Sequence, residues 1–391
     1  MRKIAILVEP HFMYKHVGVR NLIFSLYKAL MNNGILVDFI SYDYQGKSIS
    51  WFKIWLDEFS IMNNYSNIDS FVKGKSDEIL QAYQLDSFEK KSYVNNQEKV
   101  NFYRIGDSIS DLAYEEIIIS APWIITTDIF PLNSKLYGIV YDMIPNNYVF
   151  DKNNKPIEFA YEHLKGFQLY AKYCDKIFSI SKATKASFDR YFPQVIQKSY
   201  VMPPAVPNYL QISSHNNLLL EKENNIILAG PWDPRKGLSR IPEILNPIAQ
   251  QIDNLFIYGK PRCSNDDIKI FLTKLNKVKT ITWYEEVSNT TLSQLYSKSK
   301  ILLFPSENEG LGLPLIEAQL QGCRVVCTDF ESAREVLVNG YQIIGQDNDE
   351  ATESISKMLL EDFDYLNLLK ESKSFFSKDK MNTFITEHII G

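Results

Sequence analysis

The sequence predicts an α/β protein made of two consecutive Rossmann-like β/α/β domains. Short apolar runs typical of buried strands alternate along the chain with segments whose apolar residues follow helical spacing. This alternation runs twice, and the two series are separated by residues 202–207, where three prolines exclude both a helix and a central strand. The length of 391 residues exceeds one ordinary core and suits two to three domains.

The first series starts with an apolar run at Lys3–Val8, followed by helical spacing over residues 18–31 and a second strand at 35–40. Asn33 and Gly34 separate this helix from the second strand, so the three elements predict one right-handed β/α/β unit. Further strands are predicted at residues 116–120, 136–141 and 176–180, with a helix at 156–173. The more polar residues 45–100 are expected to form local helices and loops.

The second series repeats the same pattern after the prolines. Its predicted strands are residues 225–229, 255–258, 280–283, 300–304 and 324–328, and its predicted helices are 238–251, 267–275, 290–299 and 314–321. The proline-rich segment places the domain boundary between residues 1–205 and residues 206–380. Because ligands bind beyond the carboxyl ends of parallel strands, we expect the chemistry in a cleft across which the two domains face each other.

Composition excludes several classes of protein. With 42 basic and 47 acidic residues the net charge is −5, which disfavours a nucleic-acid groove and electrostatic docking on an anionic membrane. No apolar stretch approaches the 18 residues that span a bilayer, and the first nine residues lack the architecture of a signal peptide. The four cysteines are too few for a disulfide scaffold, and Cys323 and Cys327 have no His nearby to complete a zinc site. We therefore expect a cytoplasmic protein without a metal.

The segment FPSENEGLGLPLIEA, residues 304–318, joins a predicted strand to a predicted helix and carries the strongest candidate site. Glu309 lies in the loop and Glu317 in the first turn of the helix, while Gly310 and Gly312 permit close backbone approach to a ligand. A carboxylate on each side suits a ligand rich in hydroxyl groups. The alternative is that Glu317 only complements the helix dipole and the glycines only form a turn.

The segment AGPWDPRKG, residues 229–237, also joins a predicted strand to a helix. Arg235 and Lys236 can together neutralise a diphosphate, or can be an exposed basic turn. In the first half, Asp142 follows the strand at 136–141 and is either a site residue or the acceptor of an Asx turn. Gly18 lies at the first strand–helix junction without the G-x-G-x-x-G pattern, so a dehydrogenase is not favoured.

These segments resemble the retaining glycosyltransferases of the GT-B fold, in particular glycosyltransferase family 4 (glycosyl transferases group 1). The resemblance rests on PSENEGLGLPLIEA with its two glutamates eight residues apart, on ILAGPWDPRKGL, on the helix from Val287 through Tyr296, on YDMIP and on CDKIFSISKATK. It covers most of the chain outside residues 45–105. It implies transfer of a sugar from a nucleotide-sugar donor, bound by the second domain, to an acceptor bound by the first, with retained anomeric configuration.

The resemblance also implies roles for individual residues. Glu317 would hold ribose hydroxyls, Glu309 would hold donor-sugar hydroxyls, and Arg235 and Lys236 would stabilise the departing diphosphate without a metal or cofactor. The backbone N–H groups that would bind the sugar and diphosphate belong to Gly310, Leu311, Gly312 and Leu313. Gly18 and Asp142 would lie on the acceptor side. A terminal helix at residues 381–390, with one apolar face, would pack back on the first domain.

The leading functional hypothesis is a glycosyltransferase that acts on a glycan or lipid-linked acceptor in bacterial surface polysaccharide or glycoconjugate synthesis. Such an enzyme would work in the cytoplasm, with at most peripheral contact with the inner face of the membrane, and would not bind nucleic acid. The first alternative is a non-catalytic protein of the same shape that binds an acceptor and stabilises a transferase partner. A second is a nucleotide-sugar epimerase of the same architecture, whose donor loops have different sequences.

Overall fold

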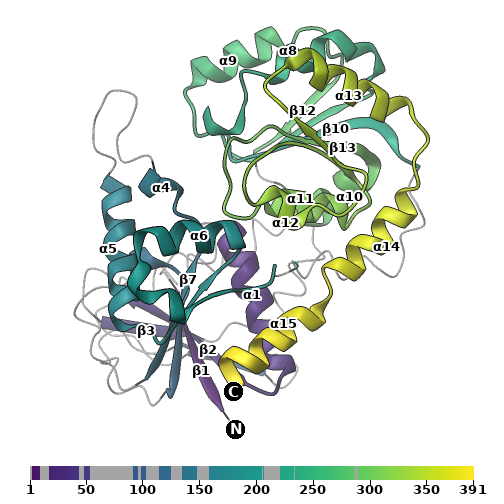
Figure 1. The fold of residues 1–391 in the computed structure, drawn as a ribbon. Helices are drawn as coiled ribbons and strands as arrows, with labels where there is room; N and C mark the ends of the chain where they lie inside the picture. The colour runs from purple at the N-terminus through teal and green to yellow at the C-terminus, as the bar shows by residue number, and fades with distance from the viewer. Residues whose placement is uncertain are drawn as a thin grey trace. The chain divides into compact units, whose positions relative to one another are not determined.

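The structure is a computed structural model, and the chain divides into two compact units (Figure 1). The first unit ends at Asn208 and also takes in Lys378–Gly391, while the second runs from Tyr209 to Ser377. The predicted boundary at residues 205 and 206 falls in a segment of which only part is described. The structure describes residues 2–8, 17–43, 48–52, 91–95, 98–102, 114–124, 134–147, 158–204, 206, 221–232, 234–285, 287 and 289–391.

The first unit is built on one mixed sheet with strand order β4-β5-β3-β2-β1-β6-β7-β8-β9. Strands β2, β1, β6, β7, β8 and β9 pair in parallel, whereas β3, β4 and β5 pair antiparallel. Its elements are β1 (Lys3–Val8), α1 (Val17–Asn32), β2 (Leu36–Asp43), β3 (Ser48–Phe52), β4 (Lys91–Asn95), β5 (Glu98–Phe102), β6 (Glu116–Ile119), η2 (Pro122–Ile124), β7 (Lys135–Val140), α4 (Ile144–Asn147), α5 (Glu158–Tyr173), β8 (Lys176–Ser179), α6 (Lys182–Tyr191), η4 (Pro193–Lys198) and β9 (Ser199–Val201).

Strands β3, β4 and β5 correct one expectation. Residues 45–100 are expected to form helices and loops, but the residues described there lie in these antiparallel strands. Their sequences, SISWF, KSYVN and EKVNF, lack the continuous apolar run that identifies a strand buried on both faces. The inner strands β1, β6, β7 and β8 have such runs, and they lie where the sequence predicts them.

The second unit is built on a fully parallel sheet with strand order β12-β11-β10-β13-β14-β15. This is the order of a doubly wound Rossmann sheet, in which the chain reverses its direction of winding between the two central strands. Its elements are β10 (Glu223–Ala229), η6 (Pro234–Lys236), α8 (Ile241–Leu245), η7 (Asn246–Gln251), β11 (Leu255–Tyr258), α9 (Asn265–Lys274), β12 (Ile281–Tyr284), α10 (Asn289–Lys298), β13 (Ser299–Phe304), α11 (Leu313–Gln319), β14 (Arg324–Thr328), α12 (Ala333–Val336), β15 (Gln342–Ile344), α13 (Asn348–Leu360) and α14 (Tyr365–Phe375).

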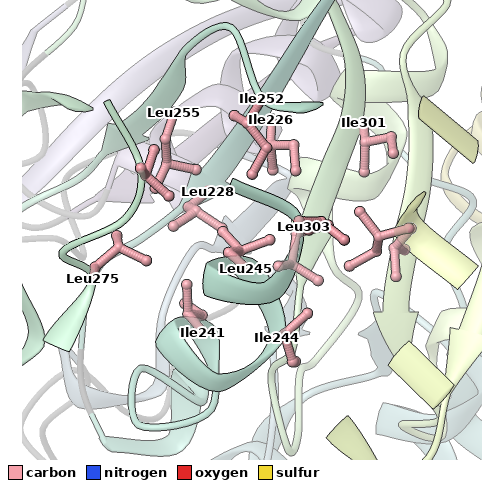
Figure 2. Packing of buried hydrophobic residues seen from close by; sticks show 14 of the residues in the cluster. Ile226, Leu228, Ile241, Ile244, Leu245, Ile252, Leu255, Leu275, Ile301 and Leu303 are labelled. Carbon is pink, nitrogen blue, oxygen red and sulfur yellow. The ribbon is translucent and has the colours of Figure 1, made fainter. Parts of the chain in front are cut away.

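Both faces of the second sheet are buried. Figure 2 shows alternate residues of the central strands packing with α8 in one apolar cluster, among them Ile226, Leu228, Ile301 and Leu303. The intervening residues, Ile227 and Leu302, are equally buried. Helices therefore cover the sheet on both sides, which leaves the carboxyl ends of the strands as the edge where polar groups can gather.

The predicted helix at residues 238–251 is shorter than expected. Only α8 is an α-helix, and residues Asn246–Gln251 form the 3-10 helix η7. The reason is Pro247, which has no N–H to donate to the carbonyl four residues earlier and so interrupts the α-helical hydrogen bonds. Ile248 and Ala249 still reach the core from this tighter helix.

The last segment of the chain belongs to the first unit. It forms α15 (Lys378–Ile385) and then the π-helical turn η8 (Thr386–Ile390), and α15 lies beside α1 (Figure 1). Phe384 packs edge-on against Phe178 of β8, with ring centroids 4.9 Å apart. The apolar face of this segment thus has a partner in the first unit.

Two cations of the first unit hold the end of this segment. The Arg2 guanidinium donates to the Ile390 carbonyl at 2.8 Å, and the Lys176 ammonium donates to the His388 carbonyl at 2.6 Å. The last carbonyl groups of a helix have no partner within the helix, so these bonds satisfy groups that the end of a helix leaves open. No helix in the described part of the chain is long and apolar enough to cross a membrane.

We expect replacement of Phe384 by Ala to destabilise the first unit by about 3–5 kcal/mol, the usual cost of truncating a buried aromatic residue. The ring is 4% exposed and fills the space against Phe178. Urea denaturation of the purified variant measures the free energy of unfolding. Phe375→Ala, at a ring that is 37% exposed on α14, is the matched control and should cost far less. Equal losses in the two variants would contradict the docking described above.

Candidate active site

Two loops leave adjacent strands at the point where the winding of the second sheet reverses. One follows β10 and contains residues 230–237, and the other follows β13 and contains residues 305–312. The two strands pair in parallel, so both loops emerge at the carboxyl edge. This switch point is where open α/β sheets bind their ligands. The Glu307 N–H donates to the Arg235 carbonyl at 2.9 Å, which joins the loops directly.

The structure brings three of the predicted site residues together. The Lys236 ammonium bonds Glu309 Oε1, and Nη1 of Arg235 lies 3.4 Å from the same oxygen. Arg235 also donates to the carbonyl of Asn308. Only 5% of the Lys236 side chain and 14% of the Glu309 side chain are exposed. A buried cation is stable only when it is paired, and Lys236 has both this carboxylate and the ring of Phe304, whose centroid is 4.6 Å from Nζ.

Hydroxyl groups fix the loop that carries Glu309. Ser306 donates to Glu309 Oε1 at 2.5 Å, and Ser332 donates to the Glu309 carbonyl at 3.0 Å. Thr328, the last residue of β14, donates to the Ser306 carbonyl. Arg235, Lys236 and Ser306 all contact Oε1 of Glu309, and no donor among the described residues bonds Oε2 in this network. Glu309 is thus oriented by the protein through one oxygen.

Glycine residues allow the two loops to lie close to each other. Gly237 has a φ of 69°, and a Cβ there would lie 2.4 Å from the Pro305 carbonyl oxygen. Any larger residue would push the loops apart. Gly312 has a φ of 86° and is the N-cap of α11, so the helix begins at Leu313.

The start of α11 corrects the predicted position of Glu317. The helix begins one residue earlier than expected, so Glu317 is its fifth residue and lies beyond the first turn. Because the helix dipole acts within the first turn, a role in complementing the dipole does not explain this carboxylate. Gly310, Leu311, Gly312 and Leu313 lie between the two glutamates, with Leu311 only 2% exposed. The structure thus places the four residues at the predicted strand-to-helix junction.

Glu317 is instead held by two tyrosines. Tyr296 of α10 donates to Glu317 Oε2 at 3.2 Å, and the hydroxyl of Tyr258, the last residue of β11, lies 3.4 Å from the same atom. The two hydroxyl oxygens are 2.7 Å apart. Burial, and next to it the Glu317 charge, raise the pKa of Tyr258 well above its ordinary value, so its hydroxyl stays protonated.

Tyr258 also connects this carboxylate to the first loop. Its carbonyl accepts the Gly230 N–H at 2.7 Å and the indole N–H of Trp232 at 3.1 Å. Sequence reasoning missed Tyr258, Tyr296 and Ser306 as site residues. One signal was present for Tyr258, because it ends a predicted strand and therefore had to lie at the carboxyl edge.

The two candidates of the first half lie in the first unit. Asp142 follows β7, and its Oδ1 accepts the Ile144 N–H at 2.9 Å, which is the geometry of an Asx turn. Gly18 is exposed in the first turn of α1. In the sheet, β1 and β7 are separated by β6. Asp142 thus has the local structural role that the sequence offered as an alternative.

In the part of the chain that the structure describes, no three His, Cys, Asp or Glu residues are grouped so as to hold a metal ion. All four cysteines are free thiols, and burial raises the pKa of Cys323 and of Cys327 to about 12 in each case.

Comparison with known families identifies the domain that carries this site. Residues 211–374 match the family model described as glycosyl transferases group 1, which is nearly all of the second unit and less than half of the chain. The second unit is thus similar to the glycosyl transferases group 1. Glu309, Glu317, Arg235 and Lys236 all lie within the matched residues.

The chain is also similar to proteins named as mannosyltransferases. The serotype-specific mannosyltransferase WbdA of Escherichia coli is 32% identical over 117 residues, which are 29% of this chain and 14% of WbdA. The O-antigen chain mannosyltransferase RfbU of Salmonella typhimurium is 25% identical over 190 residues, 49% of this chain and 52% of RfbU. The chain thus spans about half or less of the length of these relatives.

Solved structures resemble the whole chain. A mutant of TarM from S. aureus, crystallised with fondaparinux, alpha-GlcNAc-glycerol and UDP, matches with a TM-score of 0.63 at 13% identity, over 99% of each chain. At this identity the likeness shows the fold alone. It confirms the predicted GT-B fold class of two Rossmann-like units.

Proposed function

We propose that the protein is a retaining, metal-independent glycosyltransferase that moves a sugar from a nucleotide-sugar donor to a glycan or lipid-linked acceptor in bacterial surface polysaccharide synthesis. The observation that carries the proposal is the cluster of Arg235, Lys236 and Glu309 at the switch point of the second unit. Support also comes from the names of WbdA and RfbU and from the UDP in the TarM crystal.

Each member of the cluster has a role in this reaction. Negative charge develops on the diphosphate as the bond to the sugar breaks, and the Arg235 guanidinium and Lys236 ammonium stabilise it. These cations are preorganised because the protein already holds them in place, so little reorganisation is needed during the reaction. Their two charges supply the stabilisation that a metal ion supplies elsewhere.

The carboxylates would recognise hydroxyl groups. Glu309 is tethered through Oε1, which leaves Oε2 to accept from the donor sugar. Glu317 is held through Oε2 and would accept from the ribose. Backbone N–H groups from Gly310 to Leu313 would bind the sugar and diphosphate, while Gly18 and Asp142 of the first unit would lie toward the acceptor.

A non-catalytic binding protein is the second candidate. It would have no need for a buried cation pair beside a carboxylate, because a carboxylate–lysine pair of this burial is costly to desolvate and gives little net stability. The cluster therefore favours an enzyme over an accessory protein.

Release of nucleoside diphosphate from a panel of UDP-, GDP-, dTDP- and CMP-sugars, with and without candidate glycan acceptors, tests the proposal. We expect one donor to be turned over, at a rate that EDTA does not change, and NMR of the product to show the anomeric configuration of the donor. Turnover of none of the donors would refute an enzymatic role, and an inverted product would refute retention.

We expect Glu317→Ala to weaken binding of the nucleoside diphosphate by about 1.5–3 kcal/mol, the usual contribution of a charged hydrogen-bond partner. Isothermal titration calorimetry measures the dissociation constant. Glu353→Ala, at an exposed carboxylate of α13, is the control and should bind as the unmodified protein does. An unchanged constant in the Glu317 variant would contradict its role toward ribose.

A further inference from the structure

The two tyrosines beside Glu317 form an ordered chain of hydrogen bonds. Three oxygens, those of Tyr258, Tyr296 and Glu317 Oε2, lie within 3.4 Å of one another, but the two hydroxyls supply only two hydrogens. The ionised carboxylate can only accept. The two shortest contacts are 2.7 Å between the hydroxyl oxygens and 3.2 Å from the Tyr296 hydroxyl to Glu317 Oε2. Both are hydrogen bonds when Tyr258 donates to Tyr296 and Tyr296 donates to Glu317.

Glu317 and Glu309 are therefore supported in different ways. Glu309 is paired with two cations, so much of its charge is neutralised by the protein. Glu317 is 7% exposed, and the neutral hydroxyl groups of Tyr296 and Tyr258 lie beside its Oε2. Hydroxyl donors lower the cost of burying a carboxylate and, being neutral, do not themselves cancel its charge. A carboxylate held in this way remains a strong acceptor for a ligand hydroxyl.

The tyrosines are themselves fixed by rigid elements. The Tyr258 carbonyl accepts from Gly230 and from the Trp232 indole, in the loop that leads to Arg235 and Lys236. The Tyr296 carbonyl, near the end of α10, accepts the Lys222 ammonium at 3.0 Å. The orientation of the Glu317 carboxylate is thus set from two separate elements, strand β11 and helix α10.

We propose that Tyr296 and Tyr258 are positioning residues that hold the Glu317 carboxylate for the ribose hydroxyls of the donor nucleotide, with Tyr296 as the direct donor and Tyr258 as the support behind it. This inference rests on the proposed function, because it assigns the nucleoside to Glu317. In this arrangement Tyr258 connects Glu317, which would bind the nucleoside, to the loop that carries Arg235 and Lys236, which would bind the diphosphate.

Replacement of each tyrosine by Phe tests the inference, because the ring stays and only the hydroxyl is lost. Binding of UDP and GDP, and of the 2′,3′-dideoxy counterpart of whichever binds, is measured by calorimetry. We expect Tyr296→Phe to raise the dissociation constant of the ribonucleotide about tenfold, the loss of one hydrogen bond to a charged group. Tyr258→Phe leaves the Tyr296 donor in place, and we expect an increase of about threefold.

The dideoxy nucleotide separates positioning from mere packing. It has no ribose hydroxyls for Glu317, so we expect both variants to bind it as the unmodified protein does. In turnover assays, KM for the donor should rise more than kcat falls. Tyr341→Phe, at a tyrosine that is 40% exposed, is the matched control and should change nothing. Equal weakening of both nucleotides, or no weakening of the ribonucleotide, would overturn the inference.

Glu317→Gln, measured in parallel, distinguishes failure of the inference from failure of the proposed function. Weak ribonucleotide binding by Glu317→Gln together with normal binding by Tyr296→Phe would overturn the positioning role alone. Normal ribonucleotide binding by both variants would remove Glu317 from nucleoside recognition and overturn both. Thermal melting of each variant checks that the fold is intact.

Discussion

Replacement of Lys236 by Ala is expected to lower turnover of the donor by at least about 100-fold, the usual cost of removing one preorganised group that stabilises charge in a transition state. The Lys236 side chain is 5% exposed, so little water can replace the ammonium beside the departing diphosphate. In such a site a charge acts through a lower effective dielectric than in bulk water, which makes its loss large.

The Lys236 experiment needs a control for folding and one for charge. Circular dichroism and thermal melting show whether the variant is folded, and Lys236→Arg provides a second variant that keeps the charge. Arg240→Ala removes a cation four residues away, whose guanidinium bonds Asn348 and the Gly345 carbonyl instead of Glu309. We expect Arg240→Ala to retain turnover. A folded Lys236→Ala protein with a near-normal rate would refute the assignment.

Replacement of Glu309 by Gln is the second large effect, and it should separate catalysis from nucleotide binding. Gln keeps the shape of the side chain and removes the charge that balances Arg235 and Lys236. We expect turnover to fall at least about 100-fold, because the sugar loses its charged acceptor and the cations lose the anchor that positions them. The nucleoside diphosphate itself should bind more tightly, since the cations would then be neutralised by the ligand alone.

The opposite directions of these two effects make the Glu309 experiment decisive. Turnover is measured with the donor panel and affinity by calorimetry with the nucleoside diphosphate. Glu307→Gln is the matched control, because Glu307 is exposed two residues earlier in the same loop and only its backbone N–H joins the network. Glu309→Gln with weaker nucleotide binding and normal turnover would contradict both the charge balance and the catalytic role.

Most of this site could be predicted because its residues follow recognisable strands. Ala229 and Phe304 end continuous apolar runs, and the residues after them had to meet once both runs were recognised as neighbouring parallel strands. The tether of Glu309 to Lys236 could not be predicted, because spacing along the chain does not specify which side chains of two loops touch. Tyr296 was recognised only as part of a helix, since the direction of its hydroxyl depends on the packing of α10 against α11.

Elements with weak apolar signals were the least predictable. The antiparallel strands β3, β4 and β5 mix polar and apolar residues, so they lack the signal of a strand buried on both faces. Helix α8 ends earlier than predicted because of Pro247. The spacing of apolar residues does not indicate where a proline ends a helix. Glu317 lies in the second turn of α11 and not in the predicted first turn. The reason is that Gly312, in a left-handed conformation, caps the helix one residue earlier than predicted.

The bond from Arg2 to the Ile390 carbonyl joins residues 388 positions apart, and this separation affects how the protein folds as it is synthesised. The strands of the second unit, β10 to β15, are all synthesised before residues 378–391. Synthesis of the first unit begins earlier, but its packing is completed only when residues 378–391 have been made. Until then β8 and α1 lack their contacts with α15. A nascent chain must therefore keep the exposed apolar surface around Phe178 from aggregating while an entire further unit is translated.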